Sequence, residues 1–186
     1  MSSQVVYQGK YVQVQEEQKA GHTWEKIYLP GSLLIFPITE EGKILFIKEE
    51  RPHENPSVRW KPITGFYEEG DLEENTNREL QEEVALKANI VEPFLEMKTS
   101  GTLNVTTYVA LAWELEESFL PNPDGDVILG IEALSLEEII DRTMTGEFER
   151  GIGAYAYLRL QEEVRRGWRT EKKFYQTDLH PKRKTP

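Results

Sequence analysis

Three carboxylates lie close together in the segment Arg-Glu-Leu-Gln-Glu-Glu at residues 78–83. In a helix, Glu79 and Glu83 are one turn apart and Glu82 is three residues from Glu79, so the three side chains share nearly one face. Clustered carboxylate oxygens are the ligands that Mg²⁺ prefers, together with phosphate oxygens of a substrate. The pattern is that of a candidate magnesium site or, with no cation bound, of a solvated acidic helix face.

The preceding residues predict the helix that carries these carboxylates. Gly65 and Gly70 predict a loop, because glycine adopts backbone conformations that side chains disfavour. Asp71 followed by Glu74 is a capping box, in which each residue can satisfy the other's backbone N–H. We therefore expect a helix over residues 72–84.

The order of these residues resembles the Nudix hydrolase signature, in which a glycine, a spaced acid and an Arg-Glu-apolar-x-Glu-Glu core follow one another. The matching residues are Gly65, Asp71, Arg78, Glu79, Leu80, Glu82, Glu83 and Leu86. Three departures are visible: Asp71 replaces the first glutamate, the second spacer is one residue short, and Ala85 replaces a glycine. The Arg-Glu-Leu-Gln-Glu-Glu core is intact.

The resemblance implies the roles of the site residues. Glu79, Glu82 and Glu83 would bind Mg²⁺, or Mn²⁺, and the backbone carbonyl of Thr64 would add a ligand. Arg78 would orient the carboxylates through a salt bridge. Glu82 or Glu83 would also be placed to act as the catalytic base.

A second candidate base lies in the turn-forming segment Pro121-Asn122-Pro123-Asp124-Gly125-Asp126. In related enzymes the loop before the last strand carries an acid that acts as base or extra ligand, which makes Asp126 the first candidate and Asp124 the second. The alternative is that both aspartates only form the turn.

Residues 50–62 resemble the ADP-ribose pyrophosphatase branch of the Nudix superfamily, in which an arginine ends a strand and a Trp-x-Pro precedes the signature. Arg51 is then a candidate contact for substrate phosphate. The alternative is a salt bridge between Arg51 and a neighbouring glutamate. Lys61 stands where that branch usually has a glutamate.

Length and composition limit the other possibilities. A chain of 186 residues is long enough for one domain. A net charge of −11 argues against a protein that binds nucleic acid backbones, and the absence of cysteine excludes a disulfide framework. The sequence has no basic leader followed by a long apolar run, so we expect an unprocessed, soluble, cytoplasmic protein that does not enter a membrane.

Three segments are expected along the chain: an N-terminal β arm over residues 1–30, a Nudix domain over 31–169 and a charged tail over 170–186. The arm shows short strand patterns and would be a contact between two copies in a homodimer. Trp24 and Tyr28 are candidate substrate-binding residues, as is Tyr11, and each could instead belong to the core.

The domain itself reads as a Nudix-type α/β/α sandwich around a mixed β-sheet. Strands are expected at 32–39 and 43–49 as a hairpin, and at 90–97 and 105–115. A capping box at Ser135 predicts a helix to about Gly146, and residues 153–166 have helical apolar spacing.

The function implied is Mg²⁺-dependent hydrolysis of the pyrophosphate bond of a nucleoside diphosphate linked to a group X. ADP-ribose leads and a nucleotide sugar follows; the products would be a nucleoside monophosphate and a phosphorylated X. Two alternatives stay open: a degenerate Nudix domain that binds a nucleotide without cleaving it, and an acidic interaction domain with no nucleotide site.

Overall fold

The computed structural model describes residues 3–52, 54–122, 125, 127–148 and 151–167. The predicted tail at 170–186 lies outside these residues. The strands are β1 Ser3–Gln8, β2 Gln13–Lys19, β3 His22–Tyr28, β4 Gly31–Pro37, β5 Ile44–Glu50, β6 Val58–Tyr67, β7 Leu86–Thr99, β8 Leu103–Glu117 and β9 Val127–Leu134. The helices are α1 Leu72–Val84, α2 Leu136–Thr145 and α3 Ile152–Arg165.

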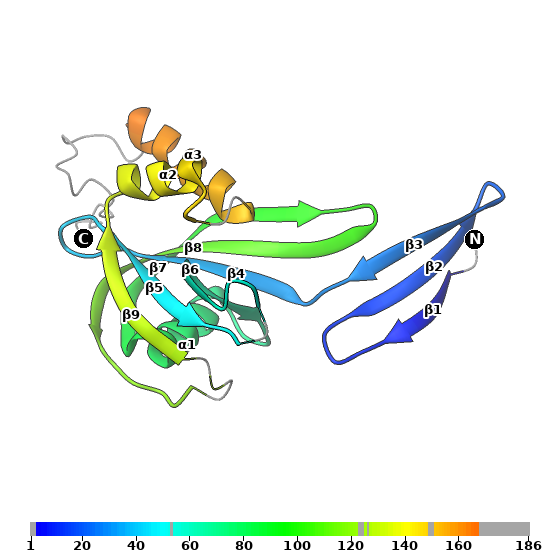
Figure 1. Cartoon of the computed structure of the whole chain (residues 1–186), viewed down its shortest axis with the longest axis horizontal. Coiled ribbons are helices and arrows are strands. Elements are labelled where there is room, and N and C mark those ends of the chain that lie inside the picture. Colours follow the sequence, from blue (N-terminus) through cyan, green and yellow to red (C-terminus); the bar gives the residue numbers. More distant parts are fainter. Residues whose placement is uncertain (1–2, 53, 123–124, 126, 149–150, 168–186) are drawn as a thin grey trace, which may run out of the picture.

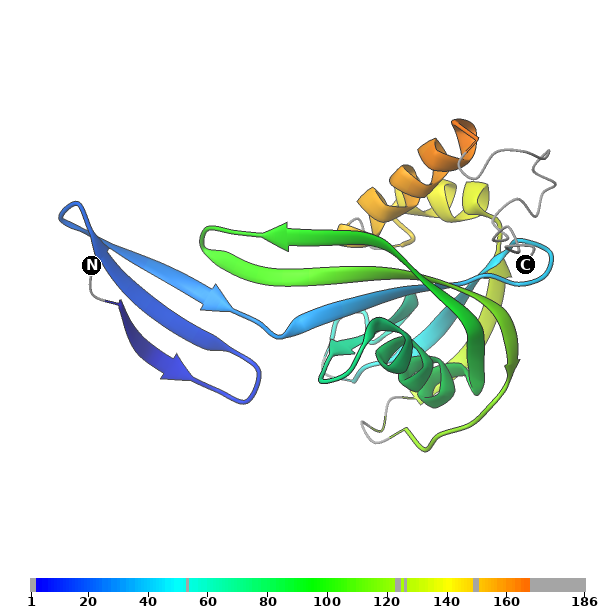
Figure 2. The ribbon, with the colours of Figure 1, turned by 180° about the vertical axis from the view of Figure 1, so that it is seen from behind.

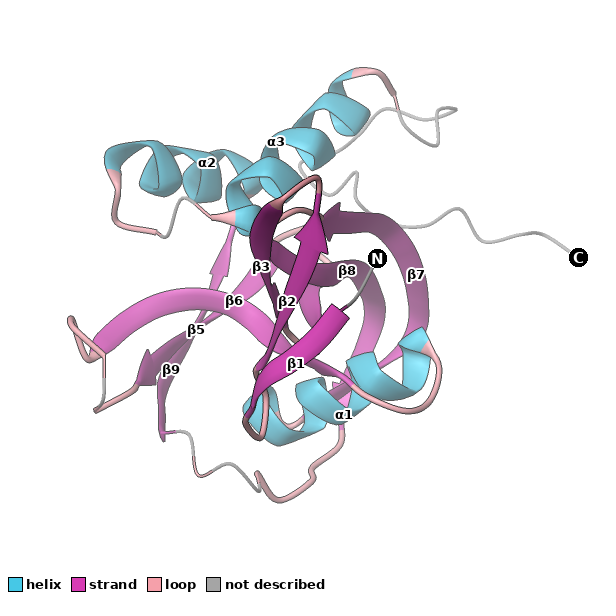
Figure 3. Cartoon of the chain, turned by 90° about the vertical axis from the view of Figure 1, so that its right-hand side faces the viewer, coloured by secondary structure: helices cyan, strands magenta, loops and turns pink. Residues whose placement is uncertain are grey.

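The strands form one mixed sheet in the order β1-β2-β3-β8-β4-β6-β5-β9, with β7 paired to β8. Strand β8 is parallel to β3 and to β4, whereas the other pairs are antiparallel. Helix α1 lies on one side of the sheet and helices α2 and α3 lie on the other (Figures 1 and 3). The expected sandwich around a mixed sheet is confirmed.

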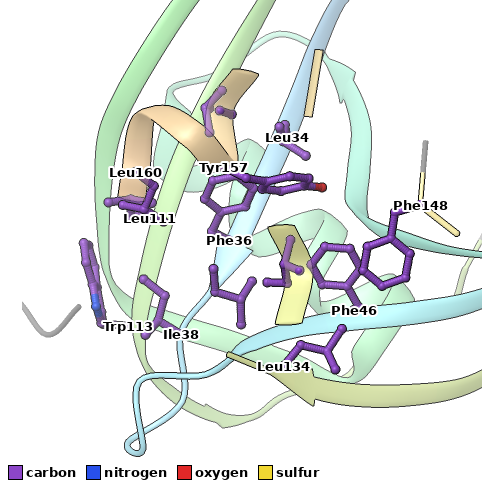
Figure 4. Packing of buried hydrophobic residues seen from close by; sticks show 14 residues of the cluster. Leu34, Phe36, Ile38, Phe46, Leu111, Trp113, Leu134, Phe148, Tyr157 and Leu160 are labelled. Atoms are coloured by element: carbon purple, nitrogen blue, oxygen red, sulfur yellow. The ribbon is translucent and has the colours of Figure 1, made fainter. Parts of the chain in front are cut away.

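The core on the α2 and α3 side is rich in aromatic rings. Phe46 stacks on Phe148 with ring centroids 4.9 Å apart, and Tyr157 of α3 lies against both Phe36 and Phe46 (Figure 4). All four rings are buried. Each buried side chain of this size contributes roughly 1.5–3 kcal/mol through removal of apolar surface from water, and this packing fixes α3 on the sheet.

The core on the other side holds α1 in place. Leu80 is completely buried and Val84 is 7% exposed, and they pack with Leu33, Ile35 and Ile63 of the sheet. These two α1 residues are one helical turn apart, so the apolar stripe of the helix faces the sheet. Glu79 and Glu83 each stand one residue before these apolar residues, so the packing of α1 also positions their carboxylates relative to strands β5 and β6.

The three helices follow their sequence signals closely. The helix expected over 72–84 is confirmed at both ends, and α2 begins after Ser135 and ends at Thr145 before Gly146. The helix expected over 153–166 is α3, Ile152–Arg165. No helix in the described part of the chain is long and apolar enough to cross a membrane.

The expected hairpin of the two buried strands is wrong. Strands β4 and β5 meet only at an isolated bridge between Ile38 and Ile44, because β6 lies between them in the sheet. Strand β6 pairs with β5 through residues 58–62 and with β4 through residues 63–67. The sequence hides this strand because Pro62 and Gly65, residues that are depleted in strands, stand inside it.

The loop expected from Gly65 is also corrected, because Gly65 is a strand residue paired with Leu33. Of the two glycines from which the loop is expected, Gly70, with φ of 113°, has the left-handed backbone that favours glycine. Strand β9 is an addition to the expected strands and pairs antiparallel with β5.

Strands β1–β3 form the arm, which extends away from the rest of the molecule (Figures 1 and 2). The short strand patterns of the sequence, at residues 5–7, 11–15 and 24–28, fall within or overlap these strands. The arm joins the main sheet where Ile27 pairs with Leu103 and Tyr28 pairs with Asn104. Its role as a contact between two copies stays a prediction.

Candidate metal-binding active site

Both ends of α1 are fixed by local hydrogen bonds. The backbone N–H of Glu74 donates to Asp71 Oδ1 over 2.9 Å, and the backbone N–H of Asp71 donates to Glu74 Oε2 over 3.1 Å. Ala85 ends the helix with φ of 55°, a left-handed conformation that favours glycine. The alanine thus adopts the conformation that a glycine would take there, and its backbone N–H donates to the carbonyl of Leu80.

One cavity of about 360 Å³ lies between α1 and the sheet. Six residues that the sequence predicts for the site line it: Arg51, Thr64, Arg78, Glu79, Glu82 and Glu83. The other lining residues are Ser32, Gly65, Phe66, Glu68 and Asn122. The structure therefore brings the carboxylates of α1, the strand β6 and the end of β5 to one place.

Gly65 is required by the close approach of Glu79. A Cβ atom at position 65 would lie 2.0 Å from Glu79 Cδ and 2.2 Å from Oε1. No side chain fits at such a distance, so only glycine lets the carboxylate lie against the backbone of β6. The first glycine of the signature is explained here by space and not by a turn.

Arg78 holds this carboxylate in place. Its Nη2 atom donates to Glu79 Oε1 over 3.1 Å and to the carbonyl of Phe66 over 3.1 Å, and Nη1 lies 3.0 Å from Glu68 Oε2. Nη2 also donates to Asn75 Oδ1. One guanidinium thus links α1 to the end of β6, the geometry to which arginine is suited.

Glu83 is buried beside a lysine that sequence reasoning did not assign to the site. Lys61 Nζ lies 3.4 Å from Glu83 Oε1, while Glu83 Oε2 is buried without a hydrogen-bond partner among the described residues. Burial raises the pKa of Glu83 to about 8; the positive charge of Lys61 opposes this shift, and the negative charges of Glu79 and Glu49 add to it.

Arg51 makes the salt bridge that was its alternative assignment, and it also lines the cavity. Its Nε donates to Glu49 Oε2 over 2.7 Å, and the Arg51 side chain is 30% exposed. Glu49 is completely buried: burial opposes its ionisation, but hydrogen bonds from Arg51 and Lys61 outweigh it and lower the pKa of Glu49. Arg51 is therefore positioned by a buried carboxylate and still faces the cavity.

A NUDIX domain model matches residues 28–154. The chain belongs to the NUDIX family. It is 30% identical over 142 residues to the ADP-ribose pyrophosphatase of Bacillus subtilis (strain 168), with 73% of this chain and 75% of the relative covered. The resemblance to the ADP-ribose pyrophosphatase branch is confirmed, and by class the protein is a Nudix pyrophosphohydrolase.

The fold has a solved counterpart. This chain matches the crystal structure of an ADP compounds hydrolase with a TM-score of 0.72 and 18% sequence identity. The match covers 91% of this chain and 95% of the other. At this identity the likeness supports the Nudix fold.

The donor atoms of this Nudix site fit a divalent metal ion, the kind of cofactor that the family generally uses. The side chains supplied by α1 are carboxylates, and Glu83 Oε2 is a buried oxygen without a hydrogen-bond partner. Oxygen donors suit Mg²⁺ and Mn²⁺. Among the described residues, no group of three His, Asp or Glu side chains is already arranged around one point. Glu79 is paired with Arg78, and Glu83 with Lys61.

Two sequence-predicted residues, Trp24 and Tyr28, are not among the described residues that line this cavity. Trp24 is 57% exposed and lines a separate hollow at the arm, and Tyr28 pairs with Gln13 and Asn104. Asp126, like Asp124, lies outside the described residues. Their assignments stay predictions.

The arm does reach the rim of the cavity through another aromatic residue. Tyr11, in the connection between β1 and β2, stacks on Phe66 with ring centroids 4.9 Å apart. Phe66 lines the cavity and is 40% exposed. An aromatic pair at this place offers an apolar surface beside the charged site.

The missed residues Lys61 and Glu49 had a weak signal in the sequence. Glu49 follows an apolar strand, and Lys61 stands between Trp60 and Pro62 in a segment without strand alternation. Their contact depends on the register of β5 and β6, in which Ile47 pairs with Lys61 and Glu49 pairs with Arg59. Glu49 is two residues from Ile47, the partner of Lys61, so the side chains of Glu49 and Lys61 lie on the same face of the sheet. Their closeness follows from the strand pairing and is not visible in the sequence.

Proposed function

We propose that this Nudix enzyme uses Mg²⁺, or Mn²⁺, to hydrolyse the pyrophosphate bond of a nucleoside diphosphate linked to X, with ADP-ribose first and a nucleotide sugar second. The products are a nucleoside monophosphate and phosphorylated X. The observation that carries the proposal is the cavity in which Glu79, Glu82 and Glu83 meet Arg51. The similarity to an ADP-ribose pyrophosphatase supports ADP-ribose as the first substrate to test.

The carboxylates of α1 and the carbonyl of Thr64 would hold the metal. Bound there, Mg²⁺ would neutralise charge on the phosphate oxygens and lower the pKa of the attacking water. Arg78 keeps Glu79 in position through the bond between Nη2 and Oε1. Arg51, which lines the cavity and is paired with Glu49 and Glu54, would bind a phosphate oxygen.

Hydrolysis requires one proton to leave the attacking water. The water oxygen bonds to one phosphorus while the bond from that phosphorus to the bridging oxygen breaks, and the second phosphate leaves with the bond's electrons. Glu82 and Glu83 both line the cavity. One of them would accept the proton, with Asp126 as the alternative base. A positioned base of this kind contributes roughly 10² to 10⁴ in rate.

We also propose that two copies associate through the arm, residues 1–30. The arm strands expose Val5, Tyr7 and Trp24 at 48%, 57% and 57%, which is apolar surface that a second copy would cover. In such a dimer, Trp24 and Tyr28 of one copy would contact substrate bound to the other copy. Light scattering of the full chain and of a Tyr7→Asp variant tests this: a dimer that dissociates in the variant supports it, and a monomeric full chain contradicts it.

A second candidate function is nucleotide binding without cleavage. It is favoured by the bond from Lys61 Nζ to Glu83 Oε1, which already engages one oxygen of a proposed metal ligand. Such a protein would bind a nucleotide in the cavity and release it unchanged.

The test is a substrate panel with Mg²⁺ or Mn²⁺ and added phosphatase, read as phosphate release. The panel holds ADP-ribose, nucleotide sugars, dinucleoside polyphosphates and nucleoside triphosphates. We expect cleavage of one class, lost in Glu83→Gln and kept in Glu137→Gln, a matched change in the first turn of α2. Tight nucleotide binding without cleavage across the panel would contradict the proposal and support the second candidate.

A further inference from the structure

Lys61 places an ammonium group in the interior of the protein, next to the proposed metal site. The residue is 6% exposed. Its Nζ lies 3.1 Å from Glu49 Oε1, 3.3 Å from Thr64 Oγ1 and 3.4 Å from Glu83 Oε1. Lysine is almost never buried unless it is paired, and here three oxygens match its three N–H donors.

The three oxygens come from three separate elements. Glu49 belongs to β5, Thr64 to β6 and Glu83 to α1. Two carboxylates and a hydroxyl around one positive charge are the donor types that also bind a hard divalent ion. We call the group formed by Glu49, Thr64 and Glu83 the oxygen cage. The ammonium of Lys61 is its cation.

The two carboxylates of the cage depend on Lys61 to different degrees. Glu49 also accepts hydrogen bonds from Arg51 Nε and Nη2, over 2.7 and 3.2 Å. Lys61 is the one hydrogen-bond donor to Glu83 among the described residues, and it contacts Oε1 only. Lys61 therefore fixes one oxygen of Glu83 and leaves Oε2 for a ligand.

We infer that Lys61 is a built-in cation of this site, which occupies the oxygen cage in place of a divalent ion and positions Glu83. The chain then binds one divalent ion fewer than the same carboxylates would bind without the lysine. The inference rests on the proposed function, because it takes Glu83 as a ligand of the metal in the cavity.

The experiment counts the Mn²⁺ ions bound to the full chain, without nucleotide, from the electron paramagnetic resonance signal of free Mn²⁺. We expect Lys61→Glu to bind one ion more than the wild type, because it removes the ammonium and adds a third carboxylate to the cage. An equal count in folded Lys61→Glu, as judged by circular dichroism, would overturn the inference.

The control variant is Lys87→Glu. It makes the same charge change at an exposed side chain, where Lys87 Nζ pairs with Glu116 over 2.8 Å. Its Mn²⁺ count should equal that of the wild type. A gain of one ion in Lys87→Glu as well would assign the effect to net charge and would also overturn the inference.

A second variant covers the case in which Lys61→Glu does not fold. Lys61→Gln is neutral and keeps Glu49 and Glu83 as the carboxylates of the cage. Ligands that bind only the folded state raise its melting temperature. Saturating Mn²⁺ should therefore raise the melting temperature of Lys61→Gln more than that of the wild type, and equal shifts in the two proteins would contradict the inference.

The outcomes separate this inference from the proposed function. If the wild type binds Mn²⁺ and cleaves a substrate, and neither variant differs in binding, only the inference fails. If Lys61→Glu binds one ion more than the wild type, but the wild type cleaves no substrate of the panel with Mg²⁺ or Mn²⁺, Lys61 remains the cation of the oxygen cage and the proposed hydrolysis fails. If no variant binds Mn²⁺, both fail.

Discussion

Helices α1 and α2 begin with the same signal and use their carboxylates in opposite ways. Asp71 with Glu74 caps α1, and Ser135 with Glu138 caps α2, each through a complete capping box. In α2 the carboxylate of Glu138 is satisfied at the helix cap, where hydrogen bonds from the backbone and side chain of Ser135 lower the pKa of Glu138. Arg142 in the last turn bonds Glu132 of β9 over 2.9 Å.

Helix α1 has no basic residue in its last turn, and it buries Glu83 against the sheet. The compensating charges come from Lys61 of β6 and from Arg78, which is bonded to Glu79. The comparison shows that a capping box fixes where a helix begins, whereas the strands opposite the helix determine whether its carboxylates form a site. The variants below test that difference.

The largest of these effects is expected for Gly65→Ala. The new Cβ would lie 2.0 Å from Glu79 Cδ, so the carboxylate must move away from β6. A displacement of about 1 Å in a catalytic group can cost roughly 10² in rate. Steady-state kinetics on the cleaved substrate measure the loss. Gly151→Ala is the control, because a Cβ there meets no atom within 4 Å.

Full activity in Gly65→Ala would contradict the role given to the contact between Glu79 and β6. A folded protein with reduced kcat and an unchanged melting temperature would support it, because the site and not the core would then carry the effect.

The pH dependence of stability separates the buried carboxylate of α1 from the exposed ones of α2. The pKa of Glu83 is about 8 in the folded protein, above its ordinary value of 4.5. Protonated Glu83 therefore contributes to the free energy of unfolding, fully below pH 4.5, and this contribution is lost as the pH rises to about 8. In EDTA, wild-type stability should therefore fall more between pH 5 and pH 8.5 than that of Glu83→Gln.

The difference should be on the order of 1–3 kcal/mol, the cost of a buried polar group without full compensation. Urea unfolding at the two pH values measures it, and Glu137→Gln should follow the wild type. If the free energy of unfolding of the wild type and of Glu83→Gln changed equally between the two pH values, the pKa of Glu83 would not be raised in the folded protein.

The smallest effect is expected for Ser135→Ala, which removes the cap of α2. The Ser135 hydroxyl accepts from the backbone N–H of Glu138 over 3.2 Å. Loss of such a cap destabilises a protein by about 1 kcal/mol. Chemical denaturation should show this decrease while kcat and KM stay at wild-type values; a loss of activity would mean that α2 contributes to the site.

The sequence was sufficient for the parts that depend on neighbours along the chain. The caps at Asp71 and Ser135 predicted where α1 and α2 begin, and the carboxylates of α1 do line one cavity. These features follow from hydrogen bonds between residues a few positions apart, so local patterns contain them.

The parts that depend on strand pairing could not be predicted in this way. Pro62 and Gly65 conceal β6, and with it the separation of β4 from β5. The contact of Lys61 with Glu49 and Glu83 joins three elements, so no spacing in the sequence reveals it. The tight space at Gly65 likewise exists only once α1 lies on β6.

The central claim is that the cavity under α1 hydrolyses a nucleoside diphosphate derivative with a metal held by α1 carboxylates. The most direct test is to incubate the wild-type chain with ADP-ribose, in EDTA and again after Mg²⁺ is restored in excess, and to follow AMP and ribose 5-phosphate by chromatography. The account predicts no product in EDTA and both products in equal amounts with Mg²⁺. Undiminished cleavage in EDTA, or intact ADP-ribose after Mg²⁺ is restored, would contradict it.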